Sequence, residues 1–182
     1  MVRGMAESTR GCVLLLIGPS SVGKSAVARE LQNMLPGTWL SAGVDLFWGM
    51  LDEAGLPAGD FRSDSEEMRR LTRGWHRAVA AIAAEGNDVI VDELWTHSWW
   101  LEDWRDVLES FQWWSVLLSA SPDALAARER AREDRPEGLA ARDLVGRPDG
   151  TSFDLVLETT RTPAPECAAT IAEMIGAVRR PS

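Results

Sequence analysis

Eight consecutive residues match the phosphate-binding pattern G-x-x-x-x-G-K-[ST]. Glycines let the backbone approach a phosphate group closely, and the amides of such a loop point inward at the anion. The lysine of the pattern can reach the β- and γ-phosphates of a nucleotide, and its serine hydroxyl can bind Mg²⁺. Lys24 is the only lysine among 19 basic residues, at a position that suits a compact point charge. The predicted loop comprises Gly18, Pro19, Ser20, Ser21, Val22, Gly23, Lys24 and Ser25.

The sequence around this loop has the expected context. The apolar run Val13–Ile17 predicts a buried parallel strand before the loop, and 26–34 predicts a helix after it. A strand, a glycine loop and a helix in this order favour a phosphate site over a chance match in a Gly/Ser-rich turn.

A candidate magnesium ligand ends another apolar run. Asp92 follows Val89–Val91, and an aspartate at the end of a buried strand can bind Mg²⁺ together with Ser25, directly or through water. The alternatives are that Asp92 caps a turn and that Glu93 is the ligand.

Asp45 is the candidate general base. It follows the predicted strand Trp39–Gly43, and an aspartate close to an alcohol can accept the hydroxyl proton during phosphoryl transfer. The same residue could be the N-cap of a helix from Leu46 to about Ala54, and it could serve in both ways.

Arginines spaced four and three residues apart follow the predicted fourth strand. On a helix they would line one side and could stabilise the charge that develops on a transferred phosphoryl group. Because acidic residues lie between them, they could equally belong to a solvated helix face. The three residues are Arg128, Arg132 and Arg135, of which the last two are the candidate catalytic arginines and the first two the candidate nucleotide ligands.

The chain has nine tryptophans and no tyrosine. Trp48, Trp95 and Trp99 follow the acidic residues closely, so they could form the wall of an aromatic acceptor pocket together with Asp45, Asp92 and Glu93, or they could belong to the core. Plain core packing is expected for Trp39, Trp75, Trp113 and Trp114.

These residues need an α/β fold to bring them together. Strands alternate with helices along the chain, which predicts a parallel sheet with helices on both faces and ligands at the carboxyl ends of the strands. We expect residues 11–182 to form one domain after a flexible segment 1–10. Further strands are predicted at 88–92, 113–118 and 153–157, and further helices at 66–84, 99–109, 122–133, 136–144 and 163–178, with a loop at 55–64.

Composition restricts the partners. The net charge of −9 argues against DNA or RNA, and the apolar runs are too short for a membrane span or a secretion signal. Cys12 and Cys167 are expected to be buried thiols in a reducing cytoplasm. Whether the chain forms a homo-oligomer stays open.

In order along the chain, these segments resemble chloramphenicol phosphotransferase, from about residue 12 to 178. The resemblance implies a P-loop kinase fold with a five-stranded parallel sheet and an arginine-bearing lid, and transfer of the ATP γ-phosphate, with Mg²⁺, to an alcohol of a small antibiotic. It also implies that Asp45 is the catalytic base. The matching segments are GPSSVGKS at 18–25, GVD at 43–45, VIVDE at 89–93, RERAREDR at 128–135, FDLVLETT at 153–160 and PEC at 165–167.

The departures from that family lie on the acceptor side. The stretch between Asp45 and Trp75 is shorter, Glu93 replaces an aspartate, and segment 95–104 is richer in tryptophan. The resemblance therefore implies the reaction more than the substrate.

The sequence leaves two alternatives to an antibiotic phosphotransferase. A metabolic or nucleotide kinase is the first alternative, although the Asp-Arg pair usual after the third strand of nucleotide kinases is missing here. A nucleotide-dependent switch is the second, although the guanine motif N-K-x-D cannot occur without another lysine.

Overall fold

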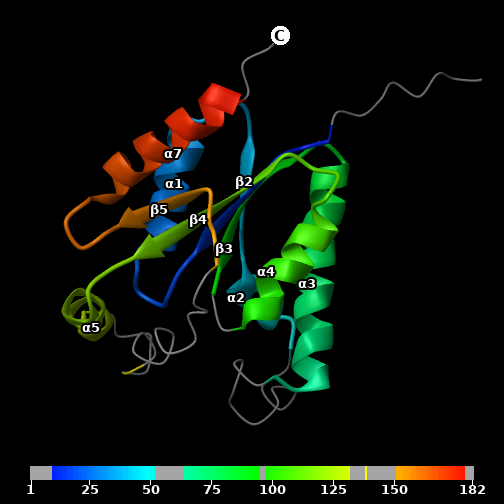
Figure 1. Ribbon diagram of the computed structural model, residues 1–182, viewed down its shortest axis with the longest axis horizontal. Helices are drawn as coiled ribbons and strands as arrows, with labels where there is room; N and C mark the ends of the chain where they lie inside the picture. The colour runs from blue at the N-terminus through cyan, green and yellow to red at the C-terminus, as the bar shows by residue number, and fades with distance from the viewer. Residues whose placement is uncertain (1–9, 52–63, 95–96, 132–137, 139–150, 179–182) are drawn as a thin grey trace, which may run out of the picture.

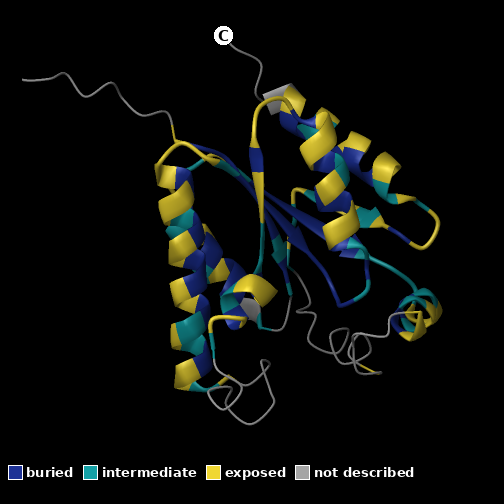
Figure 2. Cartoon of the chain, turned by 180° about the vertical axis from the view of Figure 1, so that it is seen from behind, coloured by how far each residue is buried: buried dark blue, intermediate teal, exposed yellow. Residues whose placement is uncertain are grey.

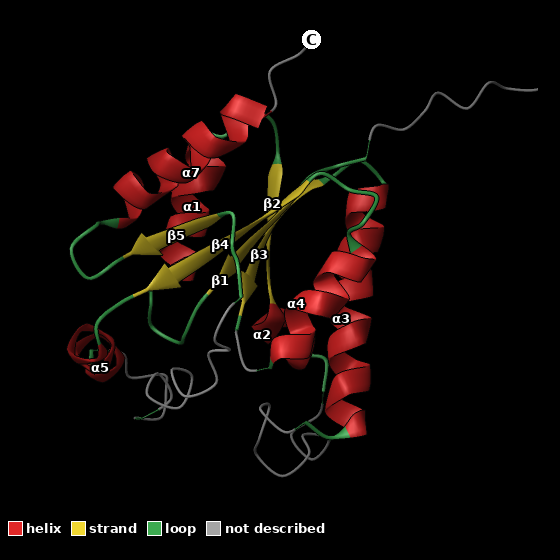
Figure 3. Cartoon of the chain, in the orientation of Figure 1, coloured by secondary structure: helices red, strands yellow, loops and turns green. Residues whose placement is uncertain are grey.

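The computed structural model describes residues 10–51, 64–94, 97–131, 138 and 151–178. Its elements alternate between strands and helices, as the hydrophobic pattern predicted (Figures 1 and 3). In chain order they are β1 (Val13–Ile17), α1 (Lys24–Met34), β2 (Trp39–Gly43), α2 (Val44–Trp48), α3 (Glu66–Ala84), β3 (Asp88–Glu93), α4 (Ser98–Val107), β4 (Trp113–Ser119), α5 (Pro122–Arg130), β5 (Leu155–Glu158) and α7 (Ala164–Val178).

Five parallel strands form one sheet in the order β2-β3-β1-β4-β5. The central strand β1 is the most apolar one, and all five of its residues are buried because strands and helices surround it on every side. Parallel pairing brings the carboxyl ends of the strands to one edge of the sheet, from which α2 and the loop before α1 emerge (Figure 1).

Helices cover both faces of the sheet. Alternate residues of each strand face opposite layers, so Leu14 and Ile90 pack with α1 and α7, whereas Leu15 and Val91 pack with α3 and α4. The buried strands lie between helices whose outer faces are exposed (Figure 2). Within the described residues, no helix is long and apolar enough to cross a membrane.

Helix α3 has the bounds that its sequence pattern predicted. The side chain of Ser65 caps its first turn by accepting a hydrogen bond from the backbone N–H of Met68, and Glu66 and Glu67 lie where the helix dipole favours a negative charge. Near the end of the helix its buried face includes Ala83, whereas Ile82 is 37% exposed.

Several predicted bounds were wrong. The helix after β2 begins at Val44 rather than Leu46, so Asp45 lies inside its first turn and the N-cap residue is Gly43. Strand β5 begins at Leu155 rather than Phe153. Helix α2 also ends at Trp48 rather than at about Ala54. The remaining helix ends agree with the prediction or differ from it by one to three residues, as expected where ends fray. Most of the predicted loop 55–64 and the predicted helix 136–144 lie outside the described residues.

A close approach of two backbones at Gly11 gives a test of the fold. A Cβ atom at this position would overlap the carbonyl oxygen of Asn87 just before β3, whereas a Cβ at Gly176 in α7 would meet nothing within 4 Å. We expect Gly11→Ala to lower the free energy of unfolding by about 1–3 kcal/mol. The control Gly176→Ala should raise it by about 0.5–1 kcal/mol, because alanine is the better helix former. Urea unfolding measures both, and a Gly11→Ala variant as stable as the wild type would contradict this backbone contact.

Candidate active site at the carboxyl ends of the strands

The loop Gly18–Ser25 joins the carboxyl end of β1 to α1, where the sequence motif predicted it. Two of its residues have left-handed backbone conformations, Ser21 with φ 62° and Gly23 with φ 106°, and these let the chain curl around an anion-sized space. Lys24 is buried, and its Nζ donates hydrogen bonds to the carbonyl oxygens of Gly18 (2.9 Å) and Pro19 (3.0 Å). The ammonium group therefore lies across the loop, at the place where phosphate charge would collect.

Ser25 and Asp92 meet beside this loop. Ser25 Oγ donates a hydrogen bond to Asp92 Oδ2 at 2.6 Å, and Lys24 Nζ lies 3.5 Å from Asp92 Oδ1. No group of three or more His, Cys, Asp or Glu side chains able to hold a metal occurs in the described part of the chain. A hydroxyl and one carboxylate are nevertheless a donor set that suits Mg²⁺, which usually keeps several waters and binds phosphate oxygens. The geometry thus fits Asp92 as a magnesium ligand better than as the cap of a turn.

Asp45 lies on the next strand connection. In the β2–β3 register Gly43 is paired with Asp92, and Asp45 follows two residues later in the first turn of α2. It is exposed, while Val44 and Trp48 on the same helix are buried. The short helix α2 is therefore anchored by its apolar side and presents Asp45 to solvent next to the strand ends that carry the phosphate loop and Asp92.

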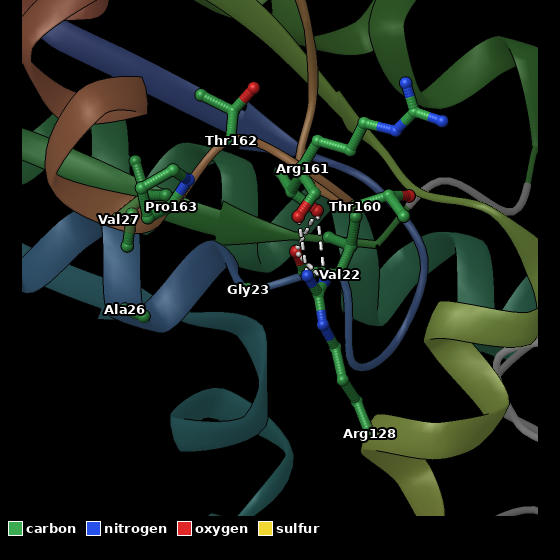
Figure 4. A pocket seen from close by; sticks show the side chains of 11 residues that line it. Val22, Gly23, Ala26, Val27, Arg128, Thr160, Arg161, Thr162 and Pro163 are labelled. Carbon is green, nitrogen blue, oxygen red and sulfur yellow. Dashed lines mark hydrogen bonds between the residues drawn. The ribbon is translucent and has the colours of Figure 1, made fainter.

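A cavity of about 470 Å³ lies on the other side of the loop, between α1, α5 and the connection from β5 to α7 (Figure 4). It is lined mainly by small and apolar side chains together with two arginines, which suits a flat, partly polar ring system. The lining residues are Val22, Gly23, Ala26, Val27, Arg128, Thr159, Thr160, Arg161, Thr162, Pro163 and Ala164.

Arg128 is held rigidly in this cavity. One guanidinium nitrogen donates to the Val22 carbonyl oxygen (3.1 Å) and to Thr159 Oγ1 (3.0 Å), and the other donates to the Thr159 carbonyl oxygen (2.6 Å). Thr159 Oγ1 itself donates to the Val22 carbonyl oxygen at 2.8 Å. Arg128 thus contacts the phosphate loop and the β5–α7 connection (Figure 4). Arg132 and Arg135, predicted to face a triphosphate with it, lie outside the described residues.

Glu93 does not face the phosphate loop, so the prediction that it is an alternative metal ligand was wrong. As the neighbour of Asp92 on a strand, it points to the opposite face of the sheet, where it is 2% exposed. Its Oε2 accepts a hydrogen bond from Trp75 Nε1 (3.0 Å), and its Oε1 accepts one from the backbone N–H of Leu94 (3.0 Å). Burial raises the pKa of this carboxyl to about 8, which these two hydrogen bonds only partly offset. Glu93 was also predicted to line the acceptor pocket, but its carboxyl group faces α3 and is closed off from solvent.

The structure tests most of the tryptophan predictions. Trp39, Trp75 and Trp114 are buried, as predicted, and Trp48 is buried too, so for Trp48 the core alternative is the better one. Trp113 is only half-buried. Trp99 is half-buried too, and its Nε1 donates to Asp64 Oδ1 at 2.8 Å. Trp95 lies outside the described residues.

A surface cluster holds Trp99 in place. The guanidinium group of Arg69 lies 5.2 Å from the centre of the Trp99 ring and donates two hydrogen bonds to Asp64, of 2.9 and 2.6 Å. The hydrogen bond from Arg69 is the main cause that lowers the pKa of Asp64. Trp99 is thereby fixed at the beginning of α4, where α4 and α3 meet, and remains partly open to solvent.

Sequence reasoning missed the connection after β5 and the histidine behind Glu93. The segment Thr159–Pro163 could have been found, because it follows the last strand at its carboxyl end, where ligands of parallel sheets bind. His76 could not, since a lone histidine within a helical pattern gives no sign that it will face a carboxyl group from another element.

The architecture is shared with solved kinase structures. A Mycobacterium tuberculosis APS kinase in complex with AMPPNP and APS aligns with a TM-score of 0.64 and 20% identity, over 92% of this chain and 98% of that one. The Deinococcus radiodurans tunicamycin resistance protein aligns with a TM-score of 0.68 and 20% identity, over 92% and 96%. At such identities the likeness concerns the fold. Strand order, phosphate loop and structural neighbours together define a P-loop kinase fold.

The particular family follows from the sequence comparison. Residues 11–176 match the model of the chloramphenicol phosphotransferase-like proteins, so the chain belongs to this family and is a transferase of the kinase class. Two Mycobacterium tuberculosis proteins named "Putative O-phosphotransferase" are 30% identical to it over 93% of this chain and 84% of theirs. A cytidylate kinase of Haloarcula marismortui is 27% identical over 68% of this chain and 60% of its own length.

The buried carboxyl group of Glu93 makes a testable contribution to stability. Its pKa rises from 4.5 to about 8 on folding, so between these values the folded state binds the extra proton and the protein loses stability as pH increases. Burial lowers the pKa of His76 below 6.5, so its opposite contribution is largely complete above pH 6.5, and the Glu93 effect dominates in this pair from pH 6.5 to 8. We expect a loss of at most about 1.4 kcal/mol per pH unit in that window.

Denaturant unfolding of the wild type and of Glu93→Gln at several pH values measures this loss. The amide cannot ionise, so the difference in unfolding free energy between the two proteins should shift in favour of Glu93→Gln as pH rises from 6.5 to 8. Parallel curves for the two proteins would mean that Glu93 is ionised in the folded state.

Proposed function

We propose that this protein transfers the γ-phosphate of ATP to a hydroxyl group of a small natural product, such as an antibiotic, and thereby inactivates it. The observation that carries the proposal is the meeting of Lys24, Ser25 and Asp92 beside the strand end that leads to Asp45. Phosphoryl transfer needs these parts: a phosphate cradle, a site for a metal ion, and a carboxylate near the acceptor hydroxyl.

The nucleotide would lie across the loop Gly18–Ser25, with its base in the cavity beside Arg128. The loop amides and Lys24 would bind the phosphates, and the planar Arg128 guanidinium group would form one wall for the base. Mg²⁺ would be held by the Ser25 hydroxyl and the Asp92 carboxylate, directly or through water, and would neutralise phosphate charge. The residues named here are sufficient for this proposal of ATP binding. We also propose that Arg132 and Arg135 belong to a lid, as the sequence predicted.

In the transfer step, the acceptor hydroxyl oxygen forms a bond to the γ-phosphorus, and the bond from that phosphorus to the bridging oxygen of ADP breaks with its electron pair. The hydroxyl proton goes to the Asp45 carboxylate, which is exposed at the start of α2. Lys24 stabilises the negative charge that develops on the phosphates.

The family description supports an antibiotic acceptor, but the relatives named cytidylate kinase favour a second candidate, a nucleotide kinase. The sequence at the end of β3 argues against a nucleotide kinase, because Asp92 is followed by Glu93 and Leu94 and the Asp-Arg pair usual in nucleotide kinases is missing.

A screen by mass spectrometry distinguishes an antibiotic phosphotransferase from a nucleotide kinase. It uses ATP, Mg²⁺ and a panel of hydroxylated compounds, among them chloramphenicol, nucleoside antibiotics and CMP. The compound that gains one phosphoryl group identifies the acceptor class.

Asp45→Asn tests the assignment of the base. The amide keeps the size of the side chain but cannot accept the proton, so kcat for the acceptor found in the screen should fall about 10²–10⁴-fold. The dissociation constant of ATP should stay within twofold. Transfer at the wild-type rate would remove Asp45 from the mechanism. Lys24→Ala is the control that should abolish transfer through the phosphate side instead.

Arg128→Lys tests the nucleotide cavity. Lysine keeps the charge but cannot make the forked contacts to Val22 and Thr159. We expect the dissociation constant of ADP, measured by calorimetry, to rise at least about tenfold, equivalent to 1.4 kcal/mol. Arg130→Lys, at an exposed position of the same helix, is the matched control and should bind ADP like the wild type. Equal affinities of the two variants would exclude Arg128 from the base site.

A further inference from the structure

A buried polar network joins α3, α4 and the end of β3. His76 on α3 is fully buried, and its Nδ1 lies 2.6 Å from Asp103 Oδ2 on α4. Its other ring nitrogen, Nε2, lies 3.9 Å from Glu93 Oε2 at the end of β3. Trp75, the residue before His76, donates its indole N–H to the same Glu93 oxygen. Two neighbouring side chains of α3 thus approach the carboxyl group of Glu93, and Asp103 of α4 is connected to it through His76.

The orientation of His76 is determined by its surroundings. A carboxylate accepts hydrogen bonds, so Asp103 selects the imidazole tautomer with the proton on Nδ1 and turns Nε2 toward Glu93. The indole of Trp104 stacks on the imidazole ring at 4.0 Å between ring centres, and Trp100 contacts it edge-on at 6.5 Å. The ring therefore cannot rotate without displacing side chains of α4.

Asp103 is in turn held from the surface. Arg77 on α3 lies 3.4 Å from its Oδ2, and Arg73 lies 3.9 Å from its Oδ1. Burial would raise the pKa of Asp103, but the hydrogen bond with His76 and the charge of Arg77 lower it. A negatively charged Asp103 is thus maintained behind the imidazole ring.

Stability alone is a poor explanation for this network. Buried polar networks often add little stability compared with apolar side chains of the same volume. The same helix interface also leaves buried polar atoms without hydrogen-bond partners, each of which costs about 1–3 kcal/mol. In the described residues these atoms are Thr72 Oγ1, His76 Nε2, Trp100 Nε1 and Trp104 Nε1.

The position of Glu93 indicates what the network controls. Glu93 is the last residue of β3, follows Asp92 directly, and is paired in the sheet with Ile17, which precedes the phosphate loop. Its Oε1 accepts the N–H of Leu94, so the carboxyl group also ties down the first residue after the strand. A shift of Glu93 would move the chain at the point where it leaves the sheet beside Asp92.

We propose that His76 is a positioning residue: its ring, fixed by Asp103 and Trp104, packs 3.9 Å from Glu93 Oε2 and, together with the hydrogen bond from Trp75, keeps Glu93 and the end of β3 in place for binding of the acceptor. The inference rests on the proposed function for the identity of the acceptor. The holding of β3 by the network does not depend on it. His76 is not among the residues that line the cavity beside the phosphate loop, so it can influence the site only through the end of β3.

The first experiment measures the network without an acceptor. Amide hydrogen exchange of Leu94, followed by NMR, reports whether its N–H stays bound to Glu93. We expect protection to fall at least about fivefold in His76→Ala and less in Asp103→Asn, which keeps an oxygen that can accept from Nδ1. His97→Gln is the matched control, since His97 stacks on Trp99 rather than facing Glu93. Unchanged protection of Leu94 in folded His76→Ala and Asp103→Asn would overturn the proposal.

The second experiment uses the acceptor identified by the phosphorylation screen. Asp103→Asn should raise the KM for that acceptor at least about fivefold and leave the KM for ATP within twofold. His76→Gln, which can place an amide near Glu93, should recover part of the activity that His76→Ala loses. Equal effects on both substrates, or no effect, would reduce the network to a structural role. If no compound of the panel is phosphorylated, the proposed function fails, while the Leu94 exchange still decides whether His76 holds β3.

Discussion

Successive side chains of a strand point to opposite faces of the sheet, and this constraint at the end of β3 organises the whole site. Asp92 points to the face covered by α1, where it meets Ser25 and Lys24. Glu93 points to the face covered by α3, where it meets Trp75 and His76. Two adjacent acidic residues therefore have different surroundings, one polar and partly exposed, the other closed and apolar.

The phosphate side of the site could be predicted from the sequence because its geometry is local. The motif Gly18–Ser25 includes its own turn, and the strand and helix that flank it follow from the hydrophobic pattern. Asp92 was predictable for a similar reason, since parallel pairing with β1 brings the end of β3 next to the loop. In each of these cases the residues that matter are fixed by one strand register.

The α3 side could not be predicted in the same way. His76 meets Asp103 across 27 positions of sequence, and whether two helices turn those residues toward each other depends on packing that periodicity does not specify. The same limit explains Trp48, where the spacing from Asp45 allowed a pocket and the rotation of a five-residue helix turned the indole into the core. Glu93 follows Asp92 in sequence, but the alternation of side chains along a strand separates the two carboxyl groups in space.

The two faces of the sheet also differ in their contacts with the phosphate loop. Arg128 connects helix α5 to both Val22 and Thr159, so any movement of that helix changes the phosphate loop and the cavity beside it together. Among the described residues, no side chain of α3 or α4 lines that cavity, and the contact of this layer with the site passes through the end of β3. A substitution in that layer can therefore reach the phosphate loop and Asp92 through Glu93.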